Sequence, residues 1–326
     1  MTLLFEKNRR IASPALAPAQ NDFEPGGRAE LTIGLINNMP DSGLKAAERQ
    51  FMRLLKESAG DTRIRFHCFS LPSVARSPAA KSYIEREYAD IADLDRLEVD
   101  GLIVTGAEPN AATLRQERFW RDLVDVIDWA TTNTRSTIWS CLAAHAAVLH
   151  LDGIERCRLA TKCSGIYRCA KLTDDWLTRG LPSRLKISHS RLNGLSEGDL
   201  AACSYQVLTR SDEAGVDIFA KQLQSRFIFF QGHPEYDARS LQREYMRDLA
   251  RFLSGERDEY PAIPANYFDA DTEARLASFE RRARLAREPT LAAELPGLIL
   301  RSNLAAGTAA ARIFKNWLGF LGAPQE

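Results

Sequence analysis

The sequence predicts an α/β protein whose sheet is mostly parallel and carries helices on both faces. Short apolar runs rich in β-branched residues, at 31–36, 64–71 and 97–105, are each followed by a segment with helical or turn character. A fourth strand–helix pair surrounds Cys141. Strands that alternate with helices are typical of a parallel sheet buried on both faces. Reactive groups in such folds gather beyond the carboxyl ends of the strands, so we expect a site in the turns there.

The first half of the chain supports this alternation element by element. Residues 1–30 mix Pro, Ala, Gly and charges without periodicity, which predicts an irregular N-terminal arm. The strand at 31–36 is expected to end at the Asn-Asn before Pro40, because proline cannot donate to a sheet ladder. The elements that follow are a helix at 42–56, a strand at 63–71, a helix near 81–89, a strand at 97–105 that runs into the Gly106 turn, and a helix at 119–132.

Cys141 lies at the junction of a predicted strand and a predicted helix. The strand, 137–139, is β-branched and aromatic, and the helix, 142–151, is rich in Ala and Leu. A thiol on such a turn is presented outward beside the amides of a helix N-terminus, which lower its pKa and can stabilise an oxyanion. This is the nucleophile-elbow arrangement without the usual Gly-x-Ser-x-Gly letters. The alternative is a small buried hydrophobic residue, as many free cysteines are.

The second informative stretch is 226–237, where a buried strand runs into Gly232, His233 and Glu235. A histidine followed two residues later by a carboxylate can form the base and the orienting partner of a nucleophilic triad. An amphipathic helix is expected at 241–254, and a charge-dense, solvated helix at 271–287. We therefore predict an arm at 1–30, an α/β catalytic domain at 31–255 and a C-terminal extension at 256–326 that packs on the same domain.

The composition limits the classes of partner. Lys plus Arg and Asp plus Glu both number 43, so no basic field is present to attract nucleic acid or an anionic membrane. The first residues lack the apolar core of a signal peptide, and no apolar run has transmembrane length. The six cysteines are expected to be reduced in the cytoplasm. The six-residue spacing of Cys157, Cys163 and Cys169 fits no usual zinc motif, so we expect no metal site.

Taken together, several collinear motifs resemble the homoserine O-acyltransferases of the MetA type, the homoserine O-succinyltransferase family, over roughly residues 31 to 320. The matching stretches are Leu35-Ile-Asn-Asn-Met-Pro40, Glu48-Arg-Gln-Phe-Met-Arg-Leu-Leu55, Gly101-Leu-Ile-Val-Thr-Gly-Ala107, Cys141 with its helix, Lys162-x-Ser164-Gly165, His189-Ser190-Arg191, Gly232-His-Pro-Glu-Tyr-Asp237, Glu244-Tyr-Met-Arg247-Asp248, Asn266-Tyr-Phe268 and Asn316-Trp-Leu318. The resemblance implies a flavodoxin-like, class I glutamine-amidotransferase-like fold.

The resemblance also implies roles for individual residues. Cys141 would be the nucleophile that accepts the acyl group, His233 its general base and Glu235 the partner of His233. Substrate-binding positions match Lys162, Ser190 and Arg247. The implied co-substrate is an acyl-CoA and the acceptor L-homoserine, with no bound cofactor, in a cytoplasmic homodimer that makes methionine precursors. For the oxyanion hole we expect the backbone amides of Leu142 and Ala107.

The acyl donor is the point at which the sequence departs from the family pattern. In the family, the fourth residue after the glycine that corresponds to Gly106 goes with donor choice: Glu with acetyl, Gly with succinyl. Here that residue is Asn110. An uncharged side chain would not repel the free carboxylate of a succinyl group, so Asn110 favours succinyl-CoA, and acetyl-CoA remains the alternative.

Three other functions stay open from the sequence. Serine could be the acceptor, because one methylene is worth only about 1–3 kcal/mol of discrimination. A glutamine amidotransferase subunit would share the fold and the Cys/His/Glu set, although no synthetase domain is attached. A non-catalytic binding protein is the last alternative, and the intact set of Cys141, His233 and Glu235 argues against it.

Overall fold

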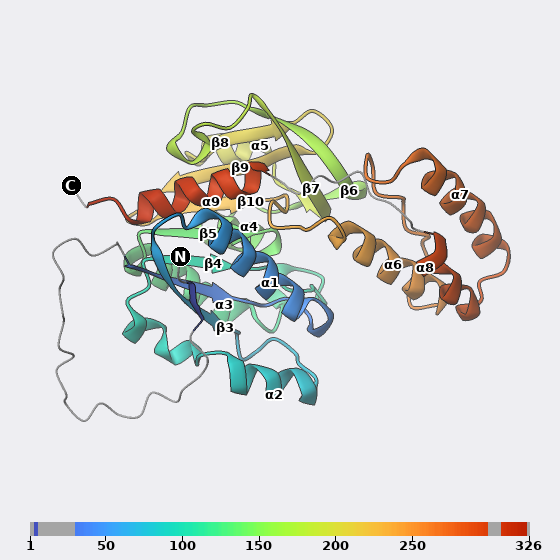
Figure 1. Cartoon of the computed structure of the whole chain (residues 1–326), viewed down its shortest axis with the longest axis horizontal. Helices are drawn as coiled ribbons and strands as arrows, with labels where there is room; N and C mark the ends of the chain where they lie inside the picture. The colour runs from blue at the N-terminus through green and yellow to red at the C-terminus, as the bar shows by residue number, and fades with distance from the viewer. Residues whose placement is uncertain (1–2, 6–29, 299–307, 325–326) are drawn as a thin grey trace.

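The computed structural model describes residues 3–5, 30–298 and 308–324, and these form one ten-stranded mixed sheet with helices on both faces (Figure 1). The strand order is β1-β3-β2-β4-β5-β10-β9-β8-β6-β7. The parallel part consists of β1 (Leu3–Phe5), β3 (Arg63–Phe69), β2 (Glu30–Ile36), β4 (Gly101–Val104), β5 (Ser136–Ser140) and β10 (Arg226–Phe230). The antiparallel part consists of β9 (Gly215–Gln222), β8 (Gln206–Ser211), β6 (Cys157–Lys171) and β7 (Arg184–Gly194). The predicted mostly parallel α/β class is confirmed.

Side chains that alternate along the central strands divide the core into two layers. On β4, Leu102 and Val104 face one layer and Ile103 faces the other. The first layer is covered by α3 (Trp120–Asn133) and α4 (Leu142–Asp152). The second is covered by α1 (Asp41–Ser58) and α9 (Thr308–Leu321). Because both faces are apolar, every residue of β4 is buried, as expected for a central parallel strand.

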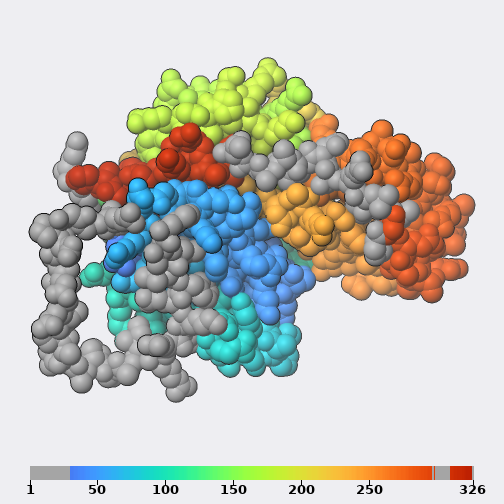
Figure 2. Space-filling view, viewed as in Figure 1, coloured from blue at the N-terminus to red at the C-terminus, as the bar shows by residue number. Residues whose placement is uncertain are grey.

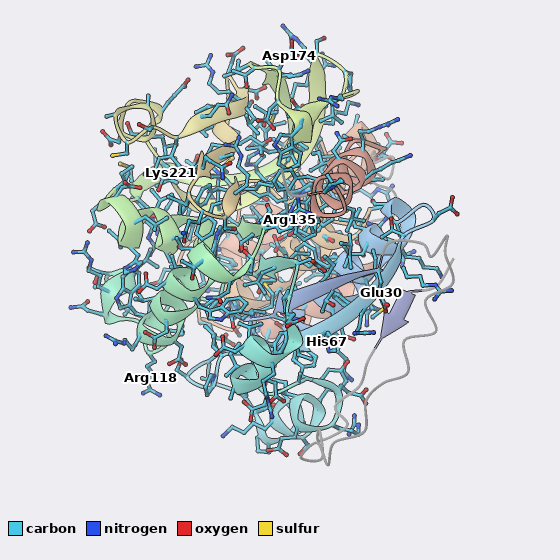
Figure 3. All side chains as sticks on the ribbon, turned by 90° about the vertical axis from the view of Figure 1, so that its left-hand side faces the viewer. Glu30, His67, Arg118, Arg135, Asp174 and Lys221 are labelled. Carbon is cyan, nitrogen blue, oxygen red and sulfur yellow. The ribbon has the colours of Figure 1, made fainter. Side chains whose placement is uncertain are left out.

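The C-terminal helix α9 returns to the sheet and lies against α1 (Figure 1). Its Trp317 is completely buried, and the indole Nε1 donates to Ser136 Oγ at 3.0 Å. Arg135, labelled in Figure 3, directly precedes β5 and donates to the carbonyl oxygens of Leu321 and Ala323. The aromatic tail therefore supplies part of the second core layer.

A second group of helices lies at one end of the molecule (Figures 1 and 2). It contains α6 (Ser240–Leu253), α7 (Ala270–Leu285) and the short α8 (Leu295–Leu298). The charge-dense segment that became α7 was predicted to be solvated, but its residues Leu276 and Phe279 are completely buried against α6. Its charges alternate with one apolar stripe, which is enough to dock a helix.

The remaining helices are α2 (Pro78–Glu87) and α5 (Glu197–Ala202). The predicted strand at 97–105 is shorter than expected, because residues Ile91–Leu97 form a 3-10 helix capped by Asp90. The arm at 1–30 contributes β1, which pairs parallel with β3, while residues 6–29 lie outside the described residues. No helix among the described residues is both long and apolar enough to cross a membrane.

Candidate active site

Cys141 occupies a sharp turn between β5 and α4. Its backbone has φ 54° and ψ −112°, in the half of conformational space that favours glycine, so the turn is strained for a cysteine. The Cys141 amide donates to the Phe230 carbonyl of the neighbouring strand β10 at 2.7 Å, which ties the turn to the sheet. The thiol is half-buried at the N-terminus of α4. This is the predicted elbow geometry.

His233 and Glu235 follow β10, the parallel neighbour of β5. Because the two strands run side by side in the same direction, the His233 turn and the Cys141 turn lie at the same edge of the sheet. The amide of His233 donates to the carbonyl of Ser188 at 2.7 Å. Its Nδ1 lies 2.7 Å from Glu235 Oε1, and both side chains are buried. The Tyr236 ring stacks on the imidazole with 4.2 Å between centroids.

Burial and the neighbouring charges shift the pKa of His233 in opposite directions. Burial by itself lowers the pKa of His233, but the carboxylate of Glu235 and the sulfur of Cys141 raise it, and the net pKa lies well above the usual value. The surroundings of His233 therefore favour the protonated imidazole. A thiolate paired with an imidazolium is the reactive form of a cysteine nucleophile.

Two backbone amides lie beside the thiol. Leu142 begins α4, so its N–H has no acceptor within the helix. The Gly106 turn packs directly against it: a Cβ at Gly106 would lie 3.0 Å from the Leu142 nitrogen. Ala107 follows in the same turn, and both Leu142 and Ala107 line the cavity that contains Cys141. The predicted oxyanion donors are thus neighbours of the nucleophile.

A cavity of about 420 Å³ brings most of the predicted residues together. It is lined by Cys141, His233, Glu235, Leu142 and Ala107 and by the predicted substrate-binding residues Lys162, Ser190 and Arg247. A larger hollow of about 1160 Å³ lies on the other side of the His233 turn, but neither Cys141 nor Glu235 lines it. The smaller cavity is therefore the candidate active site.

The predicted substrate-binding cations share one carboxylate. Lys162 Nζ lies 2.7 Å from Asp248 Oδ2, and Arg247 and Arg257 each approach Asp248 at 3.5 Å. Burial raises the pKa of Asp248, but the three cations outweigh it and the net pKa lies below the usual range. Asp248 thus fixes the positions of Lys162 and Arg247 at the cavity wall while leaving a net positive charge there.

Asn110 is placed differently from the other predicted residues. It is exposed and does not line the cavity, and its Nδ2 donates to the Glu108 carbonyl at 3.0 Å. The buried carboxylate of Glu117 accepts hydrogen bonds from the amides of Asn110 and Ala111 at 2.7 and 2.8 Å. The loop is therefore rigidly held, with Glu108 and Pro109 rather than Asn110 facing the cavity.

Three further cations line the cavity that sequence reasoning did not assign: Arg156, Arg191 and Arg243. Arg191 belongs to one of the matching motifs and Arg243 to the predicted amphipathic helix at 241–254, whereas Arg156 stands in a stretch without any spacing signal. Only the packing of β6, β7 and α6 around one cavity brings them next to Cys141.

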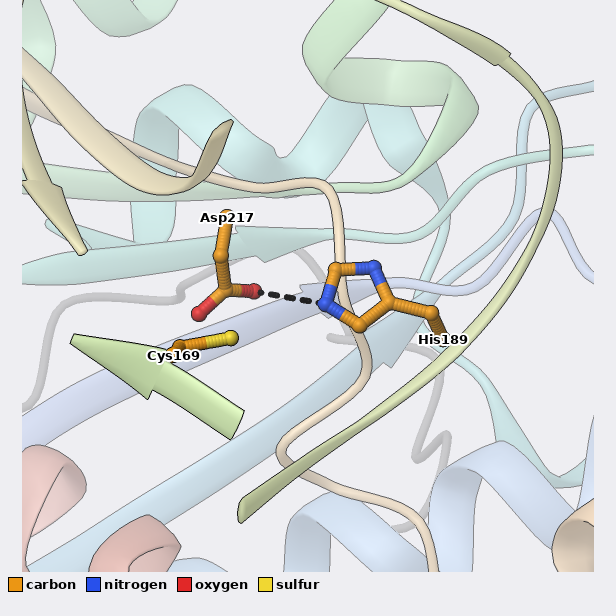
Figure 4. Close-up of side chains that lie close together, drawn as sticks. All are labelled: Cys169, His189 and Asp217. Atoms are coloured by element: carbon orange, nitrogen blue, oxygen red, sulfur yellow. Dashed lines mark ion pairs between the residues drawn. The ribbon is translucent and has the colours of Figure 1, made fainter. Parts of the chain in front are cut away.

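Three side chains form a second buried cluster (Figure 4). It consists of Cys169, His189 and Asp217, all completely buried, with 3.4 Å between His189 Nε2 and Asp217 Oδ1. From the sequence, Cys169 was considered only for its six-residue spacing from Cys163, and Asp217 was not singled out. In the described part of the chain these three residues are the one group of three or more His, Cys, Asp or Glu residues whose ligand atoms all lie within 4.8 Å of one another.

The backbone of Gly232 lies against this cluster. A Cβ there would lie 2.5 Å from Asp217 Oδ1 and 2.9 Å from His189 Nε2. The space between the imidazole and the carboxylate is therefore bordered by main chain, and the pair acts as a support for the turn that carries His233. The Gln231 amide, which donates to the Asp217 carbonyl at 2.9 Å, adds to the same support.

Gly232→Ala is expected to lower the free energy of unfolding by about 2 kcal/mol, because the added methyl overpacks a buried site. It should also reduce turnover, since the displaced turn carries His233. Chemical denaturation and steady-state rates of the purified variant check both effects.

The matched control is Gly319→Ala on α9, where an added Cβ meets nothing within 4 Å. Alanine in place of a helical glycine should stabilise by about 0.5–1 kcal/mol and leave turnover unchanged. Equal stability of the Gly232→Ala variant and the wild type would contradict the proposed tight packing.

The mixed sheet, the cysteine at the strand–helix elbow and the buried histidine–glutamate pair beside it define a class: α/β proteins with a cysteine-centred candidate active site. Comparison of the sequence with known families is consistent with this class. The family model described as homoserine O-succinyltransferase matches residues 13–286.

Similar proteins cover nearly the whole chain. A homoserine O-succinyltransferase of Bradyrhizobium japonicum is 63% identical and covers 98% of this chain and 99% of its own length. One from Rhodopseudomonas palustris is 57% identical and covers 98% of each. A solved glutamine amidotransferase from Thermotoga maritima aligns with a TM-score of 0.49 at 12% identity, over 90% of this chain and 99% of that chain. The chain belongs to the homoserine O-succinyltransferase family.

Proposed function

We propose that this enzyme transfers the succinyl group of succinyl-CoA to the hydroxyl of L-homoserine through a thioester on Cys141. The observation that supports the proposal most strongly is that Cys141, His233 and Glu235 line one cationic cavity, with Glu235 2.7 Å from His233 Nδ1 and the Cys141 sulfur within electrostatic reach of the imidazole. Membership of the family supports the donor and the acceptor.

In the first half-reaction the Cys141 thiolate attacks the thioester carbonyl of succinyl-CoA. The amides of Leu142 and Ala107 stabilise the oxyanion that forms. When the C–S bond to coenzyme A breaks, the leaving thiolate takes the proton from His233. The products are succinyl-Cys141, neutral His233 and free coenzyme A.

In the second half-reaction neutral His233 takes the hydroxyl proton of homoserine as its oxygen attacks the thioester. Collapse of the tetrahedral intermediate expels the Cys141 thiolate and leaves His233 protonated, which restores the starting ion pair. Glu235 holds the imidazole in the required tautomer and stabilises the imidazolium in both halves of the cycle.

The cations of the cavity suit an acceptor that carries a carboxylate. Arg247 presents a planar fork that can bind the homoserine carboxylate in a bidentate manner. Lys162 and Ser190, on the same wall, are proposed to complete the acceptor site. The co-substrate is an acyl-CoA, and both half-reactions use only side chains and backbone amides of the protein and the two substrates.

The proposal is tested by incubating the purified enzyme with L-homoserine and either succinyl-CoA or acetyl-CoA, while coenzyme A release and product mass are followed. We expect O-succinylhomoserine as the main product. Higher activity with acetyl-CoA would contradict the proposed donor, and higher activity with serine would contradict the proposed acceptor. Glutamine hydrolysis as the main activity would contradict the acyltransferase reaction itself.

Asn110→Glu tests the proposed role of position 110 in donor choice. A carboxylate on this loop should repel the free carboxylate of succinyl-CoA and shift the ratio of kcat/KM values towards acetyl-CoA by about tenfold. Steady-state rates with both donors check it. Ala112→Glu, which adds the same charge at an exposed position of the loop outside the cavity, is the control and should leave the ratio unchanged. An unaltered ratio would show that the exposed Asn110 side chain does not select the donor.

A further inference from the structure

Some of the cations around Cys141 are already bound to acceptor groups of the protein, and others are not. Five of them line the cavity: Arg156, Lys162, Arg191, Arg243 and Arg247. Four have protein acceptors. Lys162 and Arg247 face Asp248 at 2.7 and 3.5 Å. Arg243 donates to both oxygens of Asp237 at 2.9 and 3.0 Å.

Arg191 is also fully engaged, because it donates to the carbonyl oxygens of Asn193 (2.7 Å) and Ala214. Arg156 alone among the five makes neither a hydrogen bond nor an ion pair with any residue that the structure describes. An unpaired guanidinium at a cavity wall is costly to hold there, since a partly buried cation without a partner loses hydration and regains nothing.

Arg156 lies where α4 has ended and β6 is about to begin, and its side chain is half-buried. Burial lowers the pKa of Arg156, while the charges of Glu117 and then Cys141 raise it, so the guanidinium is within electrostatic reach of both. Glu117 makes no ion pair with Arg156, and its Oε1 instead accepts the amides of Asn110 and Ala111. The positive charge of Arg156 is therefore available to a ligand near the nucleophile.

We propose that Arg156 binds the free carboxylate of the succinyl group, both in succinyl-CoA and in the thioester on Cys141. The inference rests on the proposed function and adds the residue that distinguishes a dicarboxylic from a simple acyl donor. A succinyl group on Cys141 carries its carboxylate only two methylenes beyond the thioester. The carboxylate therefore stays within the same cavity, and a cation that binds it must line that cavity. The fork of an arginine matches a carboxylate in a bidentate manner.

This assignment gives the two substrate carboxylates different cations in the same cavity. Lys162 and Arg247, fixed by Asp248, remain available for the carboxylate of homoserine, which enters after coenzyme A has left. Arg156 holds the carboxylate that stays on the enzyme between the two half-reactions. Two carboxylates can then occupy one cavity without sharing a cation.

The test compares succinyl-CoA with butyryl-CoA, in which a methyl group replaces the free carboxylate. Coenzyme A release is measured at varied donor with saturating L-homoserine, where kcat/KM for the donor reports the acylation half-reaction, and at varied L-homoserine with fixed donor. The wild type, Arg156→Gln and Arg156→Lys are compared. We expect the ratio of kcat/KM for succinyl-CoA over butyryl-CoA to fall about 10- to 100-fold in Arg156→Gln. Arg156→Lys should recover part of the ratio, because it keeps the charge but not the fork.

Arg158→Gln is the matched control, since Arg158 is an exposed cation two residues further along and does not line the cavity. Its ratio should equal that of the wild type. An equal loss with both donors in Arg156→Gln would overturn the proposal and assign Arg156 to the coenzyme A part of the donor. A loss seen only as a raised KM for homoserine would overturn it in favour of the acceptor. A wild type that releases no coenzyme A from succinyl-CoA would instead reject the proposed function itself.

Discussion

Replacing Cys141 with alanine is expected to lower turnover by about 10⁴-fold or more, because both half-reactions pass through its sulfur. The thiol is half-buried, so its removal should leave the fold and the thermal unfolding temperature close to those of the wild type. Turnover is measured as homoserine-dependent release of coenzyme A from succinyl-CoA.

The covalent step can be followed separately from turnover. Wild-type enzyme incubated with succinyl-CoA in the absence of homoserine should gain the mass of one succinyl group, and Cys141→Ala should gain none. Cys157→Ala is the control, since Cys157 is an exposed cysteine outside the cavity and its loss should change neither result. Turnover of Cys141→Ala within tenfold of the wild type would rule out the acyl-enzyme route.

The second large effect is expected for Glu235→Gln, with a fall of about 10²- to 10⁴-fold in the rate at which homoserine discharges the succinyl-enzyme. The carboxylate raises the pKa of His233 and fixes the ring through a 2.7 Å hydrogen bond. An amide of the same shape removes the charge and allows the wrong tautomer. Single-turnover discharge of the isolated succinyl-enzyme measures the step.

The same substitution has a defined effect on pH dependence. Because Glu235 raises the pKa of His233, its neutralisation must lower that pKa, and the imidazolium should be lost at a lower pH than in the wild type. The alkaline limb of the acylation rate should therefore move to lower pH, and NMR titration of the imidazole should show the same direction. Glu57→Gln, at an exposed position on α1, is the control. An unchanged or raised His233 pKa in Glu235→Gln would contradict the pairing.

Much of the parallel half of this protein could be predicted from local patterns. Short β-branched runs followed by amphipathic segments indicated β2, α1, β5 and α4 within a few residues of their ends, because each buries one face whose period is visible in the chain. The elbow at Cys141 and the His233-x-Glu235 pair were predictable for the same reason. Both are local features whose geometry depends mainly on the residues next to them.

The antiparallel half was not predictable in this way. Strands β6 and β7 carry exposed and half-buried residues and a register shift between Arg158 and Cys163, so their alternation is blurred. The α7 segment was predicted to be solvated because its charges mask the narrow apolar stripe that docks on α6. In each case a tertiary contact, rather than local periodicity, decides which residues are buried.

The sequence by itself determined the α/β class and pointed to the proposed nucleophile and its histidine–glutamate pair, because strand and helix periods and the chemistry of the turns are properties of neighbouring residues. Only the tertiary structure decided which cations share the cavity with Cys141, which of them the protein has already paired, and that Asn110 points away from it. Those relations join residues on β6, β7 and α6 that are far apart along the chain. The ion-pair partners, distances and burial of these side chains are set only when the distant segments pack together in the folded protein.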